Sequence, residues 1–336
     1  MEHKISQTEF TYSFVLLTYN QAETVREAVL GALAQNCMPL EILISDDCSA
    51  DATFDVIQET VASYAGPHRV ILNRNDRNLG LAGHIDRIHD LSHGDVIIVA
   101  AGDDISLPQR SARIIETFEA KQPLLVCSLA NEIDLAGQRT ATKYRTATLY
   151  NSIDPSDVAG SRALYLGATG AWRKTLYQKY GAIIPGAYED LVMGFRAALE
   201  GKIAVIDEAL VIYRVGGGMV SSIMVSIYFS DLCSAQIRKI LVWKLVLRQR
   251  VKDAQTFGLT PSSPIWAILR TAESRANLDL AYYQNDFGIF LKLAFHNPVL
   301  AFRTLWTERR RKRKLSEKLR KQALIAIKSE RDTKGI

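Results

Sequence analysis

Short apolar runs alternate with helix-like segments through the first two hundred residues, and no other feature constrains the fold of this chain as strongly. The strand-like runs are residues 14–18, 41–45, 69–73, 96–100 and 124–128. The segments between the first four runs are residues 24–35, 52–64 and 80–91, and their apolar side chains recur with a helical period. This alternation predicts an α/β fold, with a mostly parallel sheet and helices on both of its faces.

A region of different character follows residue 218. Residues 131–185 are less regular, and the last strands are expected at residues 203–206 and 209–215. Beyond these, residues 226–251, 267–282 and 287–294 have helical patterns. Residues 1–218 carry 19 Lys and Arg against 27 Asp and Glu, whereas residues 219–336 carry 22 against 9. We therefore predict an acidic α/β domain over residues 1–218 and a basic, helical region over residues 219–336.

Several protein classes are disfavoured by what the sequence lacks. No stretch of about eighteen or more apolar residues occurs, so a membrane-spanning helix is not expected. Residues 1–11 are polar, unlike a secretory signal. The four cysteines lack the spacing of metal ligands and are expected to be reduced thiols in a cytosolic protein. The first strand is not followed by Gly-x-Gly-x-x-Gly, and no P-loop is present, which disfavours dinucleotide-binding and P-loop ATPase folds.

Two adjacent acids follow the apolar run at residues 96–100. The sequence there continues as Ala101-Gly102-Asp103-Asp104. Ligands of open α/β sheets bind at the carboxyl ends of the strands. Two carboxylates at that place suit a divalent cation, and a hard cation suits a phosphate, so we expect an enzyme that handles a nucleotide diphosphate. The alternative is an Asp-rich turn that caps a helix with Pro108 in its first turn.

Polar residues also follow the first two strands. Asp46 and Asp47 come after residues 41–45 and can contact a nucleotide base or a ribose hydroxyl. Asp51, a few positions later, is expected to cap the next helix. Thr18 and Asn20 end the first strand, and Asn20 is equally well explained as a turn residue.

Five pieces in order resemble the family 2 glycosyltransferases of GT-A fold. They are Thr18-Tyr19-Asn20, Ser45-Asp46-Asp47-Cys48-Ser49-Ala50-Asp51-Ala52-Thr53, Asn78-Leu79-Gly80, Ala101-Gly102-Asp103-Asp104 and Tyr188-Glu189-Asp190. The resemblance covers roughly residues 12–220. It implies that residues 1–218 form the catalytic domain, which takes a nucleotide-sugar donor and inverts the anomeric centre.

The resemblance also implies roles for single residues. Asp103 is expected to bind the Mg²⁺ or Mn²⁺ that bridges the donor diphosphate. Asp190 would be the general base, with Glu189 beside it at a helix start. The residues expected to contact the donor nucleotide are Thr18, Asn20, Asp46, Asp47, Asp104 and Arg214. Glu189 and Asp190 also have a purely structural explanation, because acids are favoured at a helix N-terminus.

Two positions depart from the family pattern. Ala101 stands where the family has its first Asp, and Asp104 is expected to compensate. Gly216 stands where many relatives have a His that helps to hold the metal or the diphosphate. Arg214 can still reach a phosphate, and a solvent-exposed side chain is the alternative. These departures keep open a degenerate GT-A protein that binds a nucleotide or saccharide without turnover. A nucleotidyltransferase is a further alternative, although its usual Gly-rich loop after the first strand is missing. Trp172 is expected in the core, with stacking on an acceptor sugar as the other possibility.

Six consecutive cations, Arg309 to Lys314, lie near the end of the chain. The apolar residues upstream of them are Leu291, Leu293, Phe295, Val299, Leu300, Phe302, Leu305 and Trp306. This combination suits an anionic bilayer surface, while a solvated helix is the alternative. Nucleic acid is not an expected partner, because no recognition module accompanies the cations. We predict a peripheral enzyme on the cytoplasmic face of the cell membrane. It would use a UDP- or dTDP-linked donor and a saccharide or polyprenyl-linked acceptor, in surface polysaccharide assembly.

Overall fold

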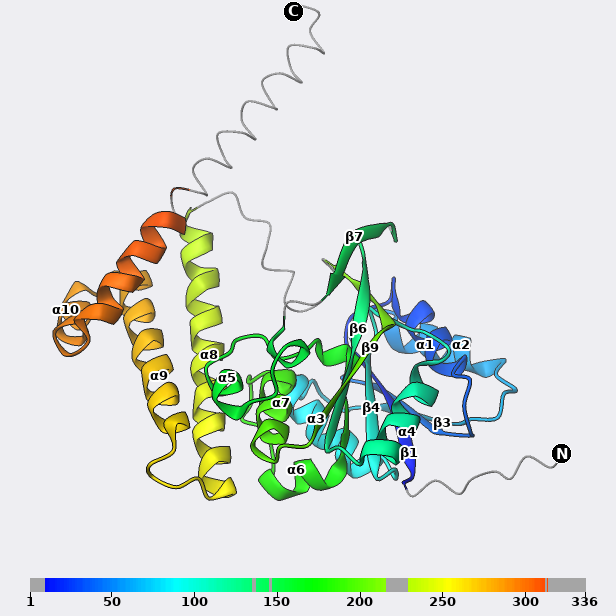
Figure 1. The fold of residues 1–336 in the computed structure, drawn as a ribbon. Helices are drawn as coiled ribbons and strands as arrows, with labels where there is room; N and C mark the ends of the chain where they lie inside the picture. The colour runs from blue at the N-terminus through cyan, green and yellow to red at the C-terminus, as the bar shows by residue number, and fades with distance from the viewer. Residues whose placement is uncertain (1–9, 135–136, 145–146, 216–228, 312, 314–336) are drawn as a thin grey trace, which may run out of the picture. The chain divides into compact units, whose positions relative to one another are not determined.

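The computed structural model describes residues 10–134, 137–144, 147–215, 229–311 and 313. Within these residues the strands form one sheet of nine (Figure 1). The strands are β1 (Tyr12–Thr18), β2 (Glu41–Asp46), β3 (Arg69–Arg74), β4 (Val96–Ala101), β5 (Ile105–Ser106), β6 (Leu125–Ile133), β7 (Arg139–Tyr144), β8 (Ala171–Arg173) and β9 (Ile203–Arg214). Their order across the sheet is β3-β2-β1-β4-β8-β6-β9-β5, and β7 pairs with β6.

The sheet is mostly parallel, which confirms the predicted fold class. β1 lies between β2 and β4 and is parallel to both, and β2 is parallel to β3. The short strand β8 is antiparallel to both β4 and β6, so β6 and its parallel neighbour β9 run in the same direction as the first group. The carboxyl ends of β1, β2 and β4 therefore meet at one edge of the sheet, which is where such sheets bind ligands.

Ten α-helices have defined bounds within the described residues. They are α1 (Val25–Leu33), α2 (Thr53–Ala62), α3 (Gly80–Leu91), α4 (Arg110–Lys121), α5 (Pro155–Ala159), α6 (Lys174–Tyr180), α7 (Glu189–Leu199), α8 (Phe229–Phe257), α9 (Pro264–Tyr283) and α10 (Phe287–His296). Residues 298–311 are helical as well. Two short 3-10 turns, η1 (Thr148–Tyr150) and η2 (Gly167–Thr169), lie in the region that the sequence marked as irregular.

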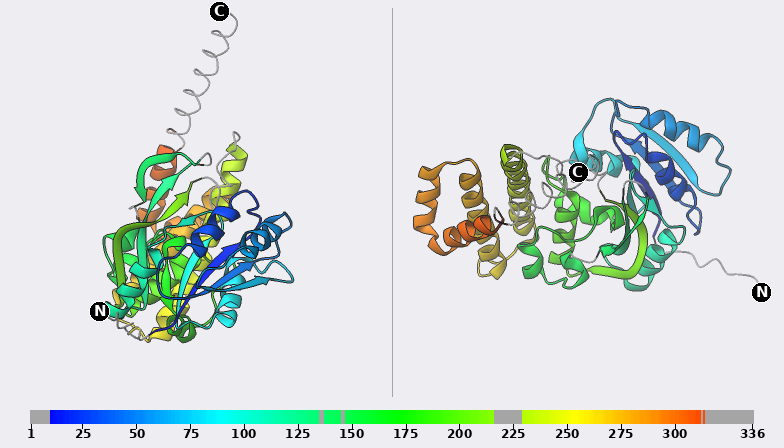
Figure 2. Two further views of the ribbon diagram at one scale, coloured as in Figure 1. Left: turned by 90° about the vertical axis from the view of Figure 1, so that its right-hand side faces the viewer. Right: turned by 90° about the horizontal axis from the view of Figure 1, so that it is seen from above.

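Helices cover both faces of the sheet (Figures 1 and 2), and alternate strand residues supply the two cores. Phe14 and Ile42 belong to a cluster that includes apolar side chains of α1, α2 and α4. Their neighbours Val15 and Leu43 are equally buried and point to the other face. Figure 1 shows α1 and α2 to one side of the sheet and α3 and α7 to the other. A strand buried on both faces is apolar throughout, which explains the uninterrupted runs in the sequence.

The two late strands predicted separately form one strand, β9. Between Ser128 and Leu129 of β6 the partner residue changes from Ile206 to Ala209, so two residues of β9 bulge out of register. These residues, Asp207 and Glu208, are exposed. Two charged residues at a bulge interrupt the apolar pattern without ending the strand, and the pattern alone does not distinguish the two cases.

Residues 131–185 contain more regular structure than the sequence indicated. β7, β8, α5 and α6 all lie there, and none is longer than the seven residues of α6. Elements this short span too few residues to show a recognisable period. The helix expected to hold Pro108 in its first turn begins two residues later, at Arg110.

The chain divides into two compact units. Among the described residues, those up to 229 and residues 242–269 form one unit, which contains the sheet, and residues 230–241 and those from 270 onward form the other. Residues 242–269, which include the second half of α8, group with the sheet, and the division into domains after residue 218 stays a prediction. None of the helices described here combines the length and the apolar character that crossing a bilayer requires.

Candidate active site

A cavity of about 290 Å³ lies at the carboxyl edge of the sheet. Its wall is built from the ends of β1 and β2, the loop after β4, the first turn of α3, the η2 turn and the start of α7. Six of the residues predicted from the sequence line it, namely Thr18, Asp47, Asp103, Asp104, Glu189 and Asp190. The fold thus collects acids from three distant parts of the chain around one cavity.

Asp47 follows β2 and is held in place by hydrogen bonds. Its Oδ1 accepts from Nδ2 of Asn75 at 2.8 Å and from the backbone N–H of Leu79 at 2.9 Å. Its own N–H donates to the carbonyl oxygen of Thr18 at 2.9 Å, which ties the end of β2 to the end of β1. A ligand in the cavity therefore meets a carboxylate whose orientation is already set.

Asp103 and Asp104 are buried in the cavity wall after β4. Burial raises the pKa of Asp103, and burial together with the charge of Asp103 raises the pKa of Asp104 well above its usual range. Arg214 opposes both shifts: its N–H donates to Oδ1 of Asp104 at 2.9 Å, and its Nε donates to the carbonyl oxygen of Asp103 at 3.2 Å. Arg110, which is fully buried at the start of α4, also lowers the pKa of Asp104 by its charge. The pair remains costly to ionise, and a bound cation would relieve that cost.

Glycines allow two loops to approach these acids closely. A Cβ on Gly102 would lie 2.4 Å from Oε1 of Gln21 and 2.9 Å from Cγ2 of Thr18. A Cβ on Gly167, in the η2 turn, would lie 2.4 Å from Oε1 of Glu189. A side chain at either position would push the wall of the cavity apart.

Glu189 and Asp190 form the first turn of α7, and both line the cavity. Burial and the charge of Asp190 raise the pKa of Glu189 to about 8. Burial raises the pKa of Asp190 to about 6, against the lowering effects of the Leu191 N–H, which donates to its Oδ1 at 2.7 Å, and of the Arg250 charge. The two carboxyls are therefore unequal, and Asp190 is the one that is mostly ionised at neutral pH.

Arg250 of α8 anchors the start of α7. It is fully buried, and its Nη1 donates to three backbone carbonyls between Val158 and Ser161 at 2.9–3.0 Å. Its Nη2 donates to the carbonyl oxygen of Leu191 at 3.1 Å. The sequence does not single out Arg250, because an Arg in a basic helical region is normally expected at the surface. No spacing in the sequence marks it as different.

Asn20 and Asp46 do not line the cavity. The Oδ1 of Asn20 accepts from the N–H of Ala50 at 2.9 Å, and Asn20 adopts a φ of 51° in the turn after β1. The carboxylate of Asp46 is fully buried and accepts from Oγ1 of Thr18 at 3.1 Å and from the N–H of Ser49 at 2.8 Å. Both side chains join the β1 and β2 loops, and their predicted contact with the donor stays a prediction.

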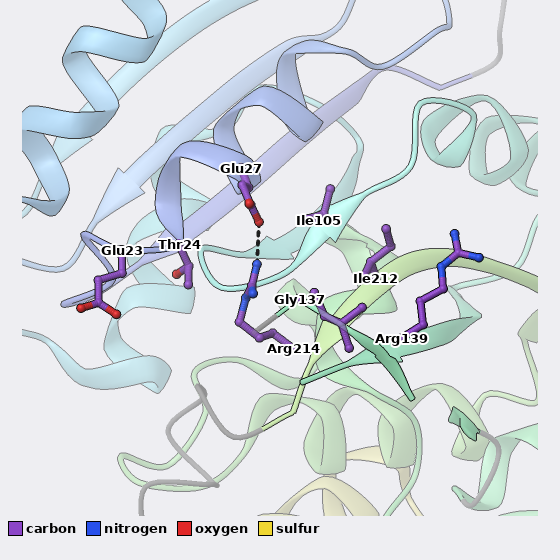
Figure 3. Close-up of a pocket in the computed structure, with 9 residues that line it drawn as sticks. Glu23, Thr24, Glu27, Ile105, Gly137, Arg139, Ile212 and Arg214 are labelled. Atoms are coloured by element: carbon purple, nitrogen blue, oxygen red, sulfur yellow. Dashed lines mark hydrogen bonds and ion pairs between the residues drawn. The ribbon is translucent and has the colours of Figure 1, made fainter. Parts of the chain in front are cut away.

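Arg214 lies outside the first cavity and lines a second one, of about 450 Å³ (Figure 3). Its Nη2 donates to Oε2 of Glu27 at 2.5 Å, and Glu27 belongs to α1. The guanidinium thus braces the loop of Asp103 and Asp104 against α1. Gly216, the position expected to carry a His in relatives, lies outside the described residues.

His84 of α3 also lines the first cavity, although it is not among the site residues predicted from the sequence. Its Nε2 lies 2.7 Å from Oγ of Ser45, and burial lowers its pKa, which favours a neutral ring. Its position in the sequence could have indicated this, because His84 lies one helical turn after Gly80, which ends the Asn78-Leu79-Gly80 motif. Gly80 itself takes a φ of 67°, which favours glycine at the start of α3.

Of two structural interpretations made from the sequence, the cap at Asp51 is wrong in its position and the core position of Trp172 is confirmed. The N-cap residue of α2 is Ala52, and Asp51 precedes it, with its Oδ1 accepting from the N–H of Thr53 at 3.0 Å. Trp172 on β8 has no exposed surface, and its Nε1 donates to Nε2 of His89 at 3.2 Å. Neither residue lines the cavity.

The carboxylates of Asp103 and Asp104 fit a divalent cation as a partial ligand set. Within the described residues, no group of three or more His, Cys, Asp or Glu side chains is arranged to hold a metal alone. Mg²⁺ and Mn²⁺ are commonly held by one or two carboxylates, with substrate phosphate and water completing the shell. Buried carboxylates beside a cavity large enough for a diphosphate supply that part of the shell.

Several known proteins resemble this chain over part of its length. The succinoglycan biosynthesis protein ExoO of Rhizobium meliloti is 35% identical over 126 residues, which is 38% of this chain and 35% of that protein. A protein of Escherichia coli, the UDP-Glc:alpha-D-GlcNAc-diphosphoundecaprenol beta-1,3-glucosyltransferase WfaP, is 28% identical over 110 residues, 33% of this chain and 42% of that protein. In both relatives the chain covers less than half of the length.

Solved structures share the fold over most of the chain. TarS 1–349 of S. aureus, in complex with UDP-GlcNAc, has a TM-score of 0.52 at 14% identity and covers 86% of this chain and 92% of its own. The mannosyltransferase PcManGT of Pyrobaculum calidifontis, in complex with GDP-Man and Mn2+, has a TM-score of 0.51 at 14% identity and covers 89% of this chain and 88% of its own. At this identity the likeness establishes the fold alone.

The family model described as glycosyl transferase family 2 matches residues 13–198. This segment is more than half of the chain, and it contains the six predicted residues that line the first cavity. The chain belongs to glycosyl transferase family 2 and has its GT-A fold.

Proposed function

We propose that this protein transfers a sugar, with inversion, from a UDP- or dTDP-linked donor to a hydroxyl group of a saccharide or polyprenyl-linked acceptor. The observation that carries this proposal is the shared cavity, which joins Asp103 and Asp104 after β4 to Asp190 at the start of α7. Asp103 and Asp104 are suited to a cation beside the donor diphosphate. Asp190 is suited to accept a proton from the acceptor hydroxyl.

The donor nucleotide would lie against the ends of β1 and β2. Asp47 offers a carboxylate that Asn75 and Leu79 already orient, and a uracil or thymine N–H is a matching donor group. Thr18 lines the same wall. Asp103 and Asp104 would hold Mg²⁺ or Mn²⁺, which supplies positive charge to the departing diphosphate.

Asp190 would act as the general base. In a single displacement, the acceptor oxygen attacks C1 of the sugar while the bond between C1 and the diphosphate oxygen breaks. The acceptor proton passes to the Asp190 carboxylate, and the nucleoside diphosphate leaves with the bonding electron pair. With a pKa of about 6, Asp190 is ionised at neutral pH and still basic enough to accept a proton.

Relatives support a role in surface polysaccharide assembly. ExoO is a succinoglycan biosynthesis protein, and WfaP acts on a diphosphoundecaprenol-linked acceptor. A lipid-linked acceptor suits an enzyme held peripherally on the cytoplasmic face of the cell membrane. The cations from Arg309 to Lys314 would attract that anionic surface, although Lys312 and Lys314 lie outside the described residues.

The proposal is tested with three Asp→Asn variants and a panel of nucleotide sugars. Asp190→Asn should lower kcat by about 10²- to 10⁴-fold while UDP binding, measured by calorimetry, stays within about twofold of wild type. Asp103→Asn should raise the Mn²⁺ concentration for half-maximal activity at least about tenfold. Asp55→Asn, at an exposed position of α2, is the matched control and should behave as wild type.

Two outcomes would contradict the proposal. Full activity of Asp190→Asn would remove the assigned base. Binding of UDP by wild type without transfer or hydrolysis of any donor would favour the binding-only alternative that Ala101 suggests, and release of pyrophosphate would favour a nucleotidyltransferase.

A further inference from the structure

Exposed apolar side chains are concentrated in one short stretch of the chain. Fourteen large apolar side chains are exposed among the described residues, and eight of them lie between Phe287 and Trp306. Isolated exposed apolar residues are ordinary on protein surfaces, whereas a cluster indicates a surface that binds something. The stretch consists of α10 and the helix at residues 298–311.

Each of these helices buries one face and leaves an apolar stripe on another. In α10, Phe290 is buried with Leu278 and Ala281 of α9. Phe287, Leu291 and Phe295, spaced by four residues, share a different face and are 72%, 68% and 86% exposed. These three side chains are not part of the core of this unit.

The helix at residues 298–311 repeats the arrangement. Ala301 packs in the same small core as Phe290. Val299, Phe302 and Trp306, spaced by three and four residues, share another face and are all exposed. Two consecutive helices therefore use one face each for packing and present an apolar stripe on the face that remains.

The charges around these stripes identify the partner. Residues 287–313 contain seven Lys and Arg and one acidic residue, Glu308. Glu308 is buried and paired with Arg311 at 2.6 Å, so it contributes little negative surface. Lys292 and Arg303 directly follow the stripe residues Leu291 and Phe302, and the guanidinium of Arg310 lies 5.6 Å from the ring centroid of Trp306. All three cations are exposed, and side chains of this length can reach headgroups while the stripe enters the acyl region.

We propose that the exposed faces of α10 and of residues 298–311, defined by Phe287, Leu291, Phe295, Val299, Phe302 and Trp306, insert into the headgroup region of an anionic lipid bilayer. The inference deepens the proposed membrane location and rests on it for the identity of the partner. It differs from attraction of the basic segment alone, because apolar insertion persists when salt screens the charges. Phe and Trp are suited to this depth of a bilayer.

The test uses the full chain and vesicles of phosphatidylcholine with phosphatidylglycerol. Wild type should co-sediment with them and retain part of its binding when salt rises from about 0.1 M to about 1 M, where the Debye length falls to about 3 Å. Phe295→Ser combined with Phe302→Ser should lower the partition coefficient at least about tenfold. Leu30→Ser, at an exposed apolar position on α1, is the matched control and should bind as wild type.

Fluorescence reports insertion directly. Brominated lipids should quench part of the tryptophan emission, and Trp306→Phe should abolish the quenched part, because Trp172 and Trp243 are buried and Trp266, which is half-buried, lies outside the residues proposed to insert. Equal partitioning of the double variant and wild type, or absence of quenching, would overturn the inference. So would a dimer that the double variant dissociates without any vesicle binding, since a second copy would then be the occupant. Transfer to a soluble acceptor, measured on the same preparations, tests the proposed activity separately.

Discussion

At the residue scale, the carboxyl of Asp190 illustrates how opposing effects set one pKa. Burial raises the pKa, while the Leu191 N–H and the charge of Arg250 lower it, and the result is about 6. Glu189, one position earlier, lacks the Arg250 contribution and reaches about 8. The environment therefore distinguishes two adjacent acids that the sequence presents as equivalent.

This balance predicts the pH dependence of kcat. A general base must be ionised, so kcat should rise with pH through about 6 and level off above it. Arg250→Gln removes the lowering charge and should move this rise upward by about one pH unit or more. Arg250→Lys keeps the charge and should leave the rise close to its wild-type position, even where it lowers stability.

The pH–rate profiles of the two variants separate electrostatics from folding. The charge of Asp190 in turn raises the pKa values of Glu189, Tyr165 and Tyr188, and both variants retain all of these groups. If Arg250→Gln lowers kcat by the same factor at every pH, the charge of Arg250 does not set the pKa of Asp190. Arg250 would then act only by holding α7 in position.

At the element scale, α7 is held by the second half of α8. Arg196 of α7 and Asp253 of α8 form an ion pair at 2.9 Å and 3.2 Å, and neither side chain is exposed. Gln249 of α8 donates to Asp253 at 2.8 Å and accepts from the N–H of Ile184, just before α7, at 2.8 Å. These contacts, together with those of Arg250, explain why residues 242–269 group with the sheet.

Breaking this pair should destabilise the protein strongly. Asp253→Ala leaves the Arg196 guanidinium buried without its partner, so the free energy of unfolding should fall by about 3–5 kcal/mol. Arg26→Ala removes an exposed pair with Glu59 at 2.7 Å and should cost about 1 kcal/mol or less. Urea unfolding followed by circular dichroism measures both. A similar small loss in the two variants would mean that the buried pair does not hold α7 to α8.

At the scale of the whole molecule, charge is separated along the chain. The first 218 residues are acidic and the remainder is basic. Net charge of this kind governs association with charged surfaces and leaves the fold unaffected. The exposed cations Arg309, Arg310 and Arg313 belong to the basic part.

Removing these three charges should weaken binding to anionic vesicles. Each cation near such a surface contributes on the order of 1 kcal/mol, so changing all three to Gln should lower the partition coefficient by about 10²-fold at low salt. Changing Arg69, Arg87 and Lys121 to Gln removes the same charge from exposed positions of the first unit and should have little effect. If both triple variants lose vesicle binding to the same extent, the net charge of the protein accounts for the binding and the position of the three cations does not.

Much of the fold and part of the site could be predicted before the structure. The strands β1, β2, β3 and β4 lie within one or two residues of their predicted bounds. β1, β2 and β4 are buried on both faces and are therefore almost continuously apolar, whereas β3 is only half-buried and carries a shorter apolar run. The acids after β2 and β4 and at the start of α7 were selected by their order along the chain. Short elements such as β7 and β8, and the bulge in β9, leave no periodic signal, so the sequence did not reveal them.

The sequence by itself determined the α/β class, the family and the acids that line the cavity, since these follow from local patterns and from residues at strand ends. The tertiary structure decided the rest. It turned Asn20 and Asp46 toward bonds within the β1 and β2 loops and brought Arg250 beneath α7. It also left the apolar stripes of residues 287–306 exposed while their neighbours formed a core. Burial and partnership depend on residues far apart in the chain, so they exist only once the chain has folded.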